Sequence, residues 1–218
     1  MNKTNKNKNI QVIIFDLDGT LVDTALYIVL NYTHLFYKYH KPIPLLETMV
    51  YFSGPPLTEI FKRYFPDIPQ NELLKEFQAF ADKYGNIFAN LYEGEIQTLK
   101  KLKEAGYKLA VITSKREKAM NDNLSYFKIK DYFDILIPLD SEFPPKPHPQ
   151  SIEYILNSLH LRKEEAMIIG DSESDIQAGI NASIKTGLIT FGLKKKPDVT
   201  ADEEFASFEE IERSFVYE

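Results

Sequence analysis

Short apolar runs alternate along the chain with stretches whose apolar residues keep helical spacing. Residues 10–15 form a continuous apolar run, the pattern of a strand that is buried on both faces of a parallel sheet. Further runs predict strands at 107–113, 134–138, 166–171 and 186–191, and we expect the last of these to end the sheet. Because helical segments lie between the runs, the alternation predicts an α/β fold with a doubly wound parallel sheet.

The stretch after the first predicted strand differs from the rest because it contains helical spacing only. Between residues 22 and 92 we expect a first helix capped by Asp23, a short helix, and a long helix over 70–92 whose aromatic stripe packs in a core. The sequence therefore predicts two domains. A Rossmann-like α/β core is assigned to residues 1–21 and 93–218, and an inserted all-helical cap domain to residues 22–92.

Composition and charge exclude several classes of function. The chain has 218 residues, a net charge of −6 and no cysteine. An acidic balance provides no basic footprint for nucleic acid, so we expect no nucleic-acid partner. No stretch approaches the roughly 18 apolar residues that a membrane span needs, and we expect no membrane partner. A cysteine-free chain has no disulfide framework and suits a reducing cytoplasm, which is the location we expect.

Polar side chains follow the carboxyl ends of four predicted strands. In an open parallel sheet, ligands bind beyond these ends, so residues from distant parts of the sequence should meet there. These side chains are carboxylates, hydroxyls and an ammonium, and none is a thiol or an imidazole. In chain order they are Asp16, Asp18, Thr113, Ser114, Lys146, Asp171 and Asp175.

The first two of these, Asp16 and Asp18, raise the question of why carboxylates crowd at the end of the most apolar strand. Carboxylates can lie close together when a hard divalent cation sits among them, and Mg²⁺ combines a few carboxylates with water and phosphate oxygens. A lysine and hydroxyl groups suit the oxygens of a phosphoryl group. A carboxylate can also attack phosphorus as a nucleophile. The sequence therefore predicts a Mg²⁺-dependent phosphoryl-transfer site.

Four motifs in this order resemble those of the haloacid dehalogenase superfamily of phosphatases. They are "DLDGT" at 16–20, "VITS" at 111–114, "KPHP" beginning at Lys146 and "GDSESD" at 170–175. The resemblance covers about residues 10–192. The position of the predicted cap, directly after the first motif, is similar to the helical-cap branch of the family. The stretch "FSGPPLTEIF" at 52–61 resembles the corresponding loop in phosphoglycolate phosphatases and a related pyrophosphatase.

The resemblance implies catalytic roles for the matching residues. Asp16 would become an aspartyl phosphate, and Asp18 would protonate the leaving group and then activate water. Thr113, the Ser114 N–H and Lys146 would bind the phosphate, with Lys146 neutralising its charge. The expected substrate is a small phosphorylated metabolite, either a phosphate monoester or pyrophosphate.

The same resemblance implies a Mg²⁺ site. Asp16, the main-chain carbonyl of Asp18, and Asp171 would hold the cation, while Asp175 would act through water or by orienting Lys146.

Two other readings of the motifs are open at this point. Phosphoacceptor receiver modules place similar residues at the ends of a parallel sheet, but they have neither the helical insert nor a need for Asp18. Sugar phosphomutases such as β-phosphoglucomutase share all four motifs and the cap type. The sequence does not indicate an oligomeric state.

Three further expectations concern residues outside the motifs. We expect Lys115 to be solvated and to lie outside the site, because a lysine that opens a helix is usually exposed. We expect residues 52–61 to form the loop that faces the site and selects the leaving group. The acidic stretch at 202–212 is expected to be a solvated final helix.

Overall fold

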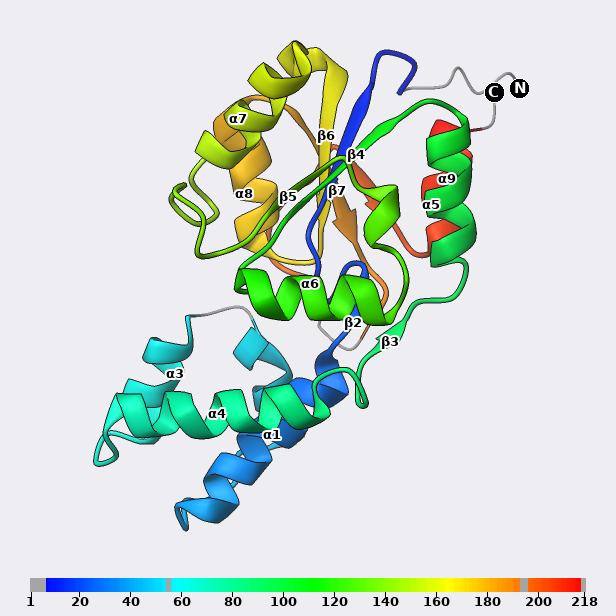
Figure 1. Cartoon of the computed structure of the whole chain (residues 1–218). Coiled ribbons are helices and arrows are strands. Elements are labelled where there is room, and N and C mark those ends of the chain that lie inside the picture. Colours follow the sequence, from blue (N-terminus) through cyan, green and yellow to red (C-terminus); the bar gives the residue numbers. More distant parts are fainter. Residues whose placement is uncertain (1–6, 54–55, 193–195, 217–218) are drawn as a thin grey trace. The chain divides into compact units, whose positions relative to one another are not determined.

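The computed structural model describes residues 7–53, 56–192 and 196–216 (Figure 1). The chain divides into two compact units. The first unit contains the segment that ends at Val22, the segment Leu91–Phe191 and the C-terminal segment. The second contains Asp23–Asn90 together with Gly192.

A six-stranded sheet forms the centre of the first unit. All adjacent strands are parallel, in the order β5-β4-β1-β6-β7-β8. This order, with helices between the strands, confirms the predicted α/β fold. The strands are β1 (Val12–Phe15), β4 (Lys108–Ile112), β5 (Ile135–Ile137), β6 (Ala166–Gly170), β7 (Lys185–Ile189) and β8 (Glu203–Phe205).

Strand register aligns the carboxyl ends of the three middle strands. Phe15, the last residue of β1, lies opposite Val111 of β4 and Ile169 of β6. Residues that directly follow these strands therefore emerge at one edge of the sheet. All four β1 residues are fully buried, as expected for an apolar run in the middle of a parallel sheet.

Helices cover both faces of this sheet (Figure 1). Helices α7 and α8 pack against one face, where Val12 and Ile14 share an apolar core with Ile152 and Ala178. Helices α5 and α9 lie together on the other face. The helices of this unit are α5 (Glu95–Glu104), α6 (Glu117–Tyr126), α7 (Gln150–Leu159), α8 (Glu173–Ala182) and α9 (Phe208–Phe215), with short 3₁₀ turns at Lys130–Tyr132 and Lys163–Glu165.

The expectations for the C-terminal segment are wrong in two respects. The strand near 186–191 is not the last, because Glu203–Phe205 adds β8 beside β7. The final helix is not solvated on all sides, since Phe208 and Ile211 are buried and Glu212 pairs with Lys101 at 2.7 Å. Acidic residues on the outer side of α9 obscure this apolar face in the sequence.

The second unit is mainly helical. Its core is aromatic: Tyr32 and Phe77 have ring centroids 5.3 Å apart, and Phe61 lies 6.2 Å from Phe77. The predicted use of the aromatic stripe for packing agrees with this arrangement. The helices are α1 (Ala25–Lys38), α2 (Leu46–Met49), α3 (Leu57–Tyr64) and α4 (Gln70–Tyr84), with a 3₁₀ turn at Val50–Ser53.

Two details of the 22–92 segment were predicted wrongly. Helix α4 ends at Tyr84, where Gly85 and Asn86, both poor helix formers, begin a turn. Ile87, which extended the apolar repeat, is 63% exposed. The segment is also not purely helical, because β2 (Val22–Asp23) and β3 (Asn90–Leu91) pair as a two-stranded sheet.

No helix in the described part of the chain is long and apolar enough to cross a lipid bilayer.

Candidate active site

The loop after β1 places Asp16 and Asp18 at the edge of the sheet. Asp16 is buried, and its N–H donates to the Ile169 carbonyl at 2.9 Å, which continues the sheet by one residue. The chain then turns tightly at Gly19, whose φ is +87°. A Cβ at Gly19 would lie 2.4 Å from Asp171 Oδ2, so only glycine lets the loop approach Asp171 this closely.

Lys146 lies inside this group of carboxylates. Its ammonium donates to Asp16 Oδ1 at 2.6 Å, to Asp175 Oδ1 at 2.5 Å and to the Ile112 carbonyl at 3.0 Å. The side chain is only 4% exposed. Burial alone would lower the pKa of Lys146, but Asp16 and Asp175 outweigh burial and raise it. Lys146 is therefore a fixed positive charge whose three N–H groups are all used.

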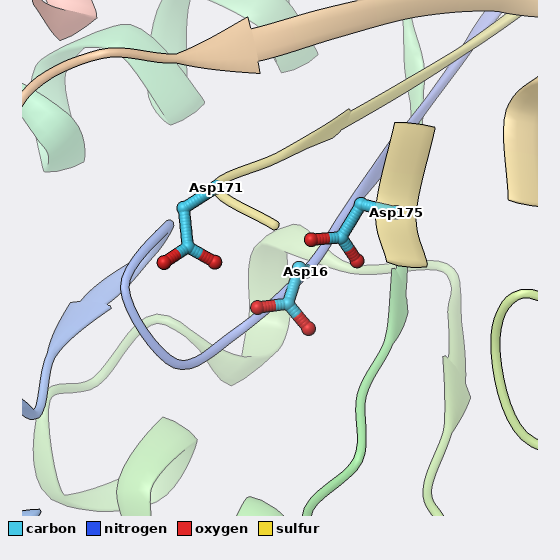
Figure 2. Close-up of side chains that lie close together, drawn as sticks. All are labelled: Asp16, Asp171 and Asp175. Atoms are coloured by element: carbon cyan, nitrogen blue, oxygen red, sulfur yellow. The ribbon is translucent and has the colours of Figure 1, made fainter. Parts of the chain in front are cut away.

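Three carboxylates converge at this edge, as Figure 2 shows. Asp16, Asp171 and Asp175 each have one oxygen within 4.8 Å of the others. Asp175 lies in the first turn of α8, and its Oδ2 also accepts hydrogen bonds from the N–H and hydroxyl of Ser172 at 3.0 and 2.6 Å. Both oxygens of Asp175 are thus engaged, which favours the expected role of orienting Lys146.

The electrostatics of Asp16 follow from this crowding. Burial raises the pKa of Asp16 to about 7, and this effect exceeds the lowering by Lys146. Asp175 and Asp171 raise the pKa further because their charges are of the same sign. The group therefore carries more negative charge than Lys146 balances. Buried oxygen donors with excess negative charge fit a hard cation such as Mg²⁺, whereas the described residues offer no sulfur or imidazole donor here.

The residues that follow β4 have different environments. Thr113 is buried, and its hydroxyl accepts a hydrogen bond from the Lys115 N–H at 3.1 Å. Ser114 is exposed. Within the described ranges, neither side chain forms a hydrogen bond to the carboxylate group. The register between β1 and β4 places Thr113 and Ser114 at the same edge of the sheet as Asp16, as the sequence predicted.

Lys115 is a member of this group, and the prediction that it is solvated and lies outside is wrong. Its ammonium donates to Asp18 Oδ1 at 2.7 Å, and the side chain is only 14% exposed. A second hydrogen bond runs to Asn123 Oδ1 on α6. Asn123 was not identified from the sequence, because its partnership with Lys115 depends on how α6 packs. The position of Lys115, two residues after Thr113 at a strand end, was the available signal.

The expected substrate loop at 52–61 belongs to the second unit, and residues 54–55 within it lie outside the described residues.

The fold and this site define an enzyme class. A parallel sheet that presents buried carboxylates, a fully bonded lysine and a threonine at the ends of its strands is suited to phosphoryl transfer. Residues 13–189 match the haloacid dehalogenase-like hydrolases. The chain belongs to this family and is a phosphatase of the haloacid dehalogenase type, which confirms the resemblance in the motifs.

Curated relatives have a narrower activity in their names. The chain is 34% identical over 186 residues to pyrophosphatase PpaX of Halalkalibacterium halodurans, covering 85% of this chain and 86% of the relative. It is 30% identical over 200 residues to pyrophosphatase PpaX of Bacillus cereus, covering 88% and 92%.

Solved structures share the fold over nearly the whole chain. A haloacid dehalogenase-like hydrolase from Streptococcus pneumoniae has a TM-score of 0.82 at 27% identity, covering 93% of this chain and 97% of its own. A protein described as a predicted phosphoglycolate phosphatase from Haemophilus somnus has a TM-score of 0.81 at 25% identity, covering 93% and 96%.

Proposed function

We propose that this chain is a Mg²⁺-dependent phosphatase that hydrolyses pyrophosphate or a small, phosphoglycolate-like phosphate monoester through an aspartyl phosphate on Asp16. The observation that carries the proposal is the buried group of Asp16, Asp171 and Asp175 with the ammonium of Lys146 at the sheet edge. The names of the PpaX relatives and of the Haemophilus somnus protein support these two substrate types.

The proposed cation site uses Asp16, Asp171 and the main-chain carbonyl of Asp18. Asp175 serves it indirectly, because its oxygens are bonded to Lys146 and Ser172. When bound, Mg²⁺ supplies positive charge against the oxygens of the phosphoryl group.

The first half of the reaction transfers the phosphoryl group to the protein. Lys146 holds Oδ1 of Asp16, which leaves the other oxygen of this carboxylate as the nucleophile. That oxygen forms a bond to phosphorus while the bond from phosphorus to the leaving oxygen breaks. Asp18, in its protonated form, gives its proton to the leaving oxygen. The Thr113 hydroxyl and the Ser114 N–H hold oxygens of the moving group.

The second half regenerates Asp16. Asp18, now a carboxylate, takes a proton from a water molecule as that water attacks phosphorus. The bond between phosphorus and Asp16 breaks, and inorganic phosphate leaves. Lys146 again faces an ionised Asp16, so its charge is balanced at the beginning and end of the cycle.

The unit formed by residues 23–90 is proposed to act as the cap, with the segment 52–61 choosing the leaving group. The proposed partner is a small phosphorylated metabolite in the cytoplasm, since a cysteine-free chain suits a reducing compartment.

The test is release of inorganic phosphate from pyrophosphate, phosphoglycolate and para-nitrophenyl phosphate. We expect steady release with Mg²⁺, its loss in excess EDTA, and recovery when Mg²⁺ is restored, because the carboxylates and the phosphate otherwise repel one another. No acceptor sugar or bisphosphate activator should be needed. Full hydrolysis in EDTA would contradict the cation site, and isomerisation of a sugar phosphate with little free phosphate would indicate a mutase.

A further inference from the structure

Lys115 brings a second positive charge to the site, apart from the charge at the nucleophile. Lys146 bonds Asp16 and Asp175, whereas Lys115 bonds Asp18. The two lysines thus divide the site into a nucleophile side and an acid–base side. Among the described residues, Lys115 is the one cation that pairs with Asp18.

The place of Lys115 beside the leaving group follows from the proposed role of Asp18. A proton donor must come within hydrogen-bond reach of the oxygen that leaves, about 2.6–3.2 Å. The Lys115 ammonium lies 2.7 Å from Asp18 Oδ1. The Lys115 ammonium therefore borders the carboxyl group that meets the leaving oxygen.

The hydrogen bonds of Lys115 leave room for a ligand. An ammonium has three N–H donors. Asp18 and Asn123 accept two of them, and within the described ranges no other group accepts the third from Lys115. Lys146 could not serve instead, since Asp16, Asp175 and the Ile112 carbonyl use all its donors.

The direction of the Lys115 side chain is fixed rather than adaptable. Asn123 is buried on α6, and its amide oxygen accepts a hydrogen bond from the ammonium. The main chain of Lys115 is also held, because its N–H donates to Thr113 Oγ1 and its carbonyl accepts from Leu139 at 2.9 Å. A charge that is aimed in this way loses little side-chain entropy when a ligand binds.

The charge of Lys115 favours one kind of leaving group over another. A leaving group with its own negative charge would be repelled by the ionised carboxylates of the site, and by Asp18 once it has given up its proton. The Lys115 ammonium, paired with Asp18, offsets part of that repulsion on the side of the leaving group. A leaving group that is an uncharged alcohol is not repelled in this way, so a nearby cation stabilises it less.

We propose that Lys115 recognises the leaving group and that this enzyme prefers substrates whose leaving group is an anion, phosphate or a carboxylate-bearing alcohol, over those that release an uncharged alcohol. This inference rests on the proposed function, because it takes Asp18 as the group that meets the leaving oxygen.

The experiment compares two monoesters that differ mainly in this charge: 2-phosphoglycolate and 2-hydroxyethyl phosphate. Phosphate release with Mg²⁺ gives kcat/KM for each, and pyrophosphate is measured beside them. We expect the wild type to favour 2-phosphoglycolate by at least about tenfold, which corresponds to about 1.4 kcal/mol. Lys115→Met should reduce that ratio to near one, and Lys115→Arg should keep part of it because the charge remains.

The ratio isolates leaving-group recognition from any effect on Asp18. A change in the position of Asp18 would lower kcat for both esters by the same factor and leave the ratio unchanged. Lys118→Met is the matched control, since Lys118 follows Lys115 closely in the chain, lies in the first turn of α6, is 70% exposed and pairs with Asp122. It should leave both activities as in the wild type.

The possible outcomes distinguish a failure of this inference from a failure of the proposed function. Equal losses for both esters in Lys115→Met overturn the inference and leave the phosphatase intact. Absence of phosphate release from any substrate by the wild type overturns the proposed function and the inference together. If thermal melting shows that Lys115→Met is unfolded, the wild type and Lys115→Arg decide. A wild-type ratio near one contradicts the inference, and a ratio above ten that Lys115→Arg retains in part supports it.

Discussion

Replacing Lys146 with methionine should destabilise the first unit strongly, and more so as the pH rises. Methionine keeps most of the volume of the stem but removes the ammonium that bonds Asp16, Asp175 and the Ile112 carbonyl. Removing one partner of a buried ion pair leaves an uncompensated charge and typically costs about 3–5 kcal/mol. We expect a loss of this size in the free energy of unfolding at pH 8 without metal.

The pH dependence follows from Asp16, whose pKa in the folded protein is raised to about 7. A carboxyl group with a raised pKa stabilises the fold fully below its unfolded pKa, and this contribution is lost as the pH rises through the folded value. Lys146 lowers the pKa of Asp16, so its removal raises the pKa further and deepens the loss at high pH. At pH 5.5, below this folded pKa, Asp16 is mostly protonated in both proteins, and the deficit of the variant should be smaller than at pH 8.

Urea unfolding followed by circular dichroism, in EDTA at pH 5.5 and 8, measures both effects. The control is Lys118→Met, which removes an exposed ion pair with Asp122 and should cost no more than about 1 kcal/mol. Adding Asp175→Asn to Lys146→Met should recover part of the loss, because one of the two unpaired carboxylates is then neutral. A deficit for Lys146→Met below about 1 kcal/mol at pH 8, or one that grows as the pH falls, would refute the reasoning.

Two further substitutions test other parts of the account. Asp18→Asn should lower kcat for phosphoglycolate by about 10²–10⁴-fold, and kcat for para-nitrophenyl phosphate by much less, since a phenolate leaves without a proton. The variant should keep its Mg²⁺ affinity, measured by calorimetry. Loss of that affinity would contradict the proposal that only the main-chain carbonyl of Asp18 binds the cation. Glu95→Gln should raise the melting temperature at pH 8 but not at pH 5. Burial raises the pKa of Glu95 to about 9, although a hydrogen bond from the Tyr92 N–H acts to lower it. The wild type therefore loses stability as the pH rises from 4.5 to 9. Equal melting temperatures at pH 8 would contradict this.

The sheet could be predicted because its central strands are buried on both faces. Runs such as Val12–Phe15 and Ala166–Gly170 are apolar throughout, which is typical of strands in a parallel sheet that is covered on both sides. Strand β8 was missed for the opposite reason. It is a three-residue edge strand with two glutamates, Glu203 and Glu204, and its burial depends on Phe205 alone.

The site residues that could be predicted are those that directly follow the end of a strand. Asp16, Thr113 and Asp171 are placed by strand register, which apolar runs reveal. The roles of Lys115 and Asn123 depend instead on the position of α6, which no local pattern specifies. A lysine side chain is long enough to point either to solvent or into a site, and packing decides between the two.

The most direct test of the central claim is whether the phosphoryl group is bound covalently to Asp16 during turnover. Wild type and Asp16→Asn are mixed with ³²P-labelled pyrophosphate and Mg²⁺, quenched with acid within the first turnover, and the label on the protein is counted. We predict label on the wild type that hydroxylamine removes, as it does from an acyl phosphate, and none on Asp16→Asn. Phosphate release by the wild type without any labelled protein, or equal label on Asp16→Asn, would contradict the account.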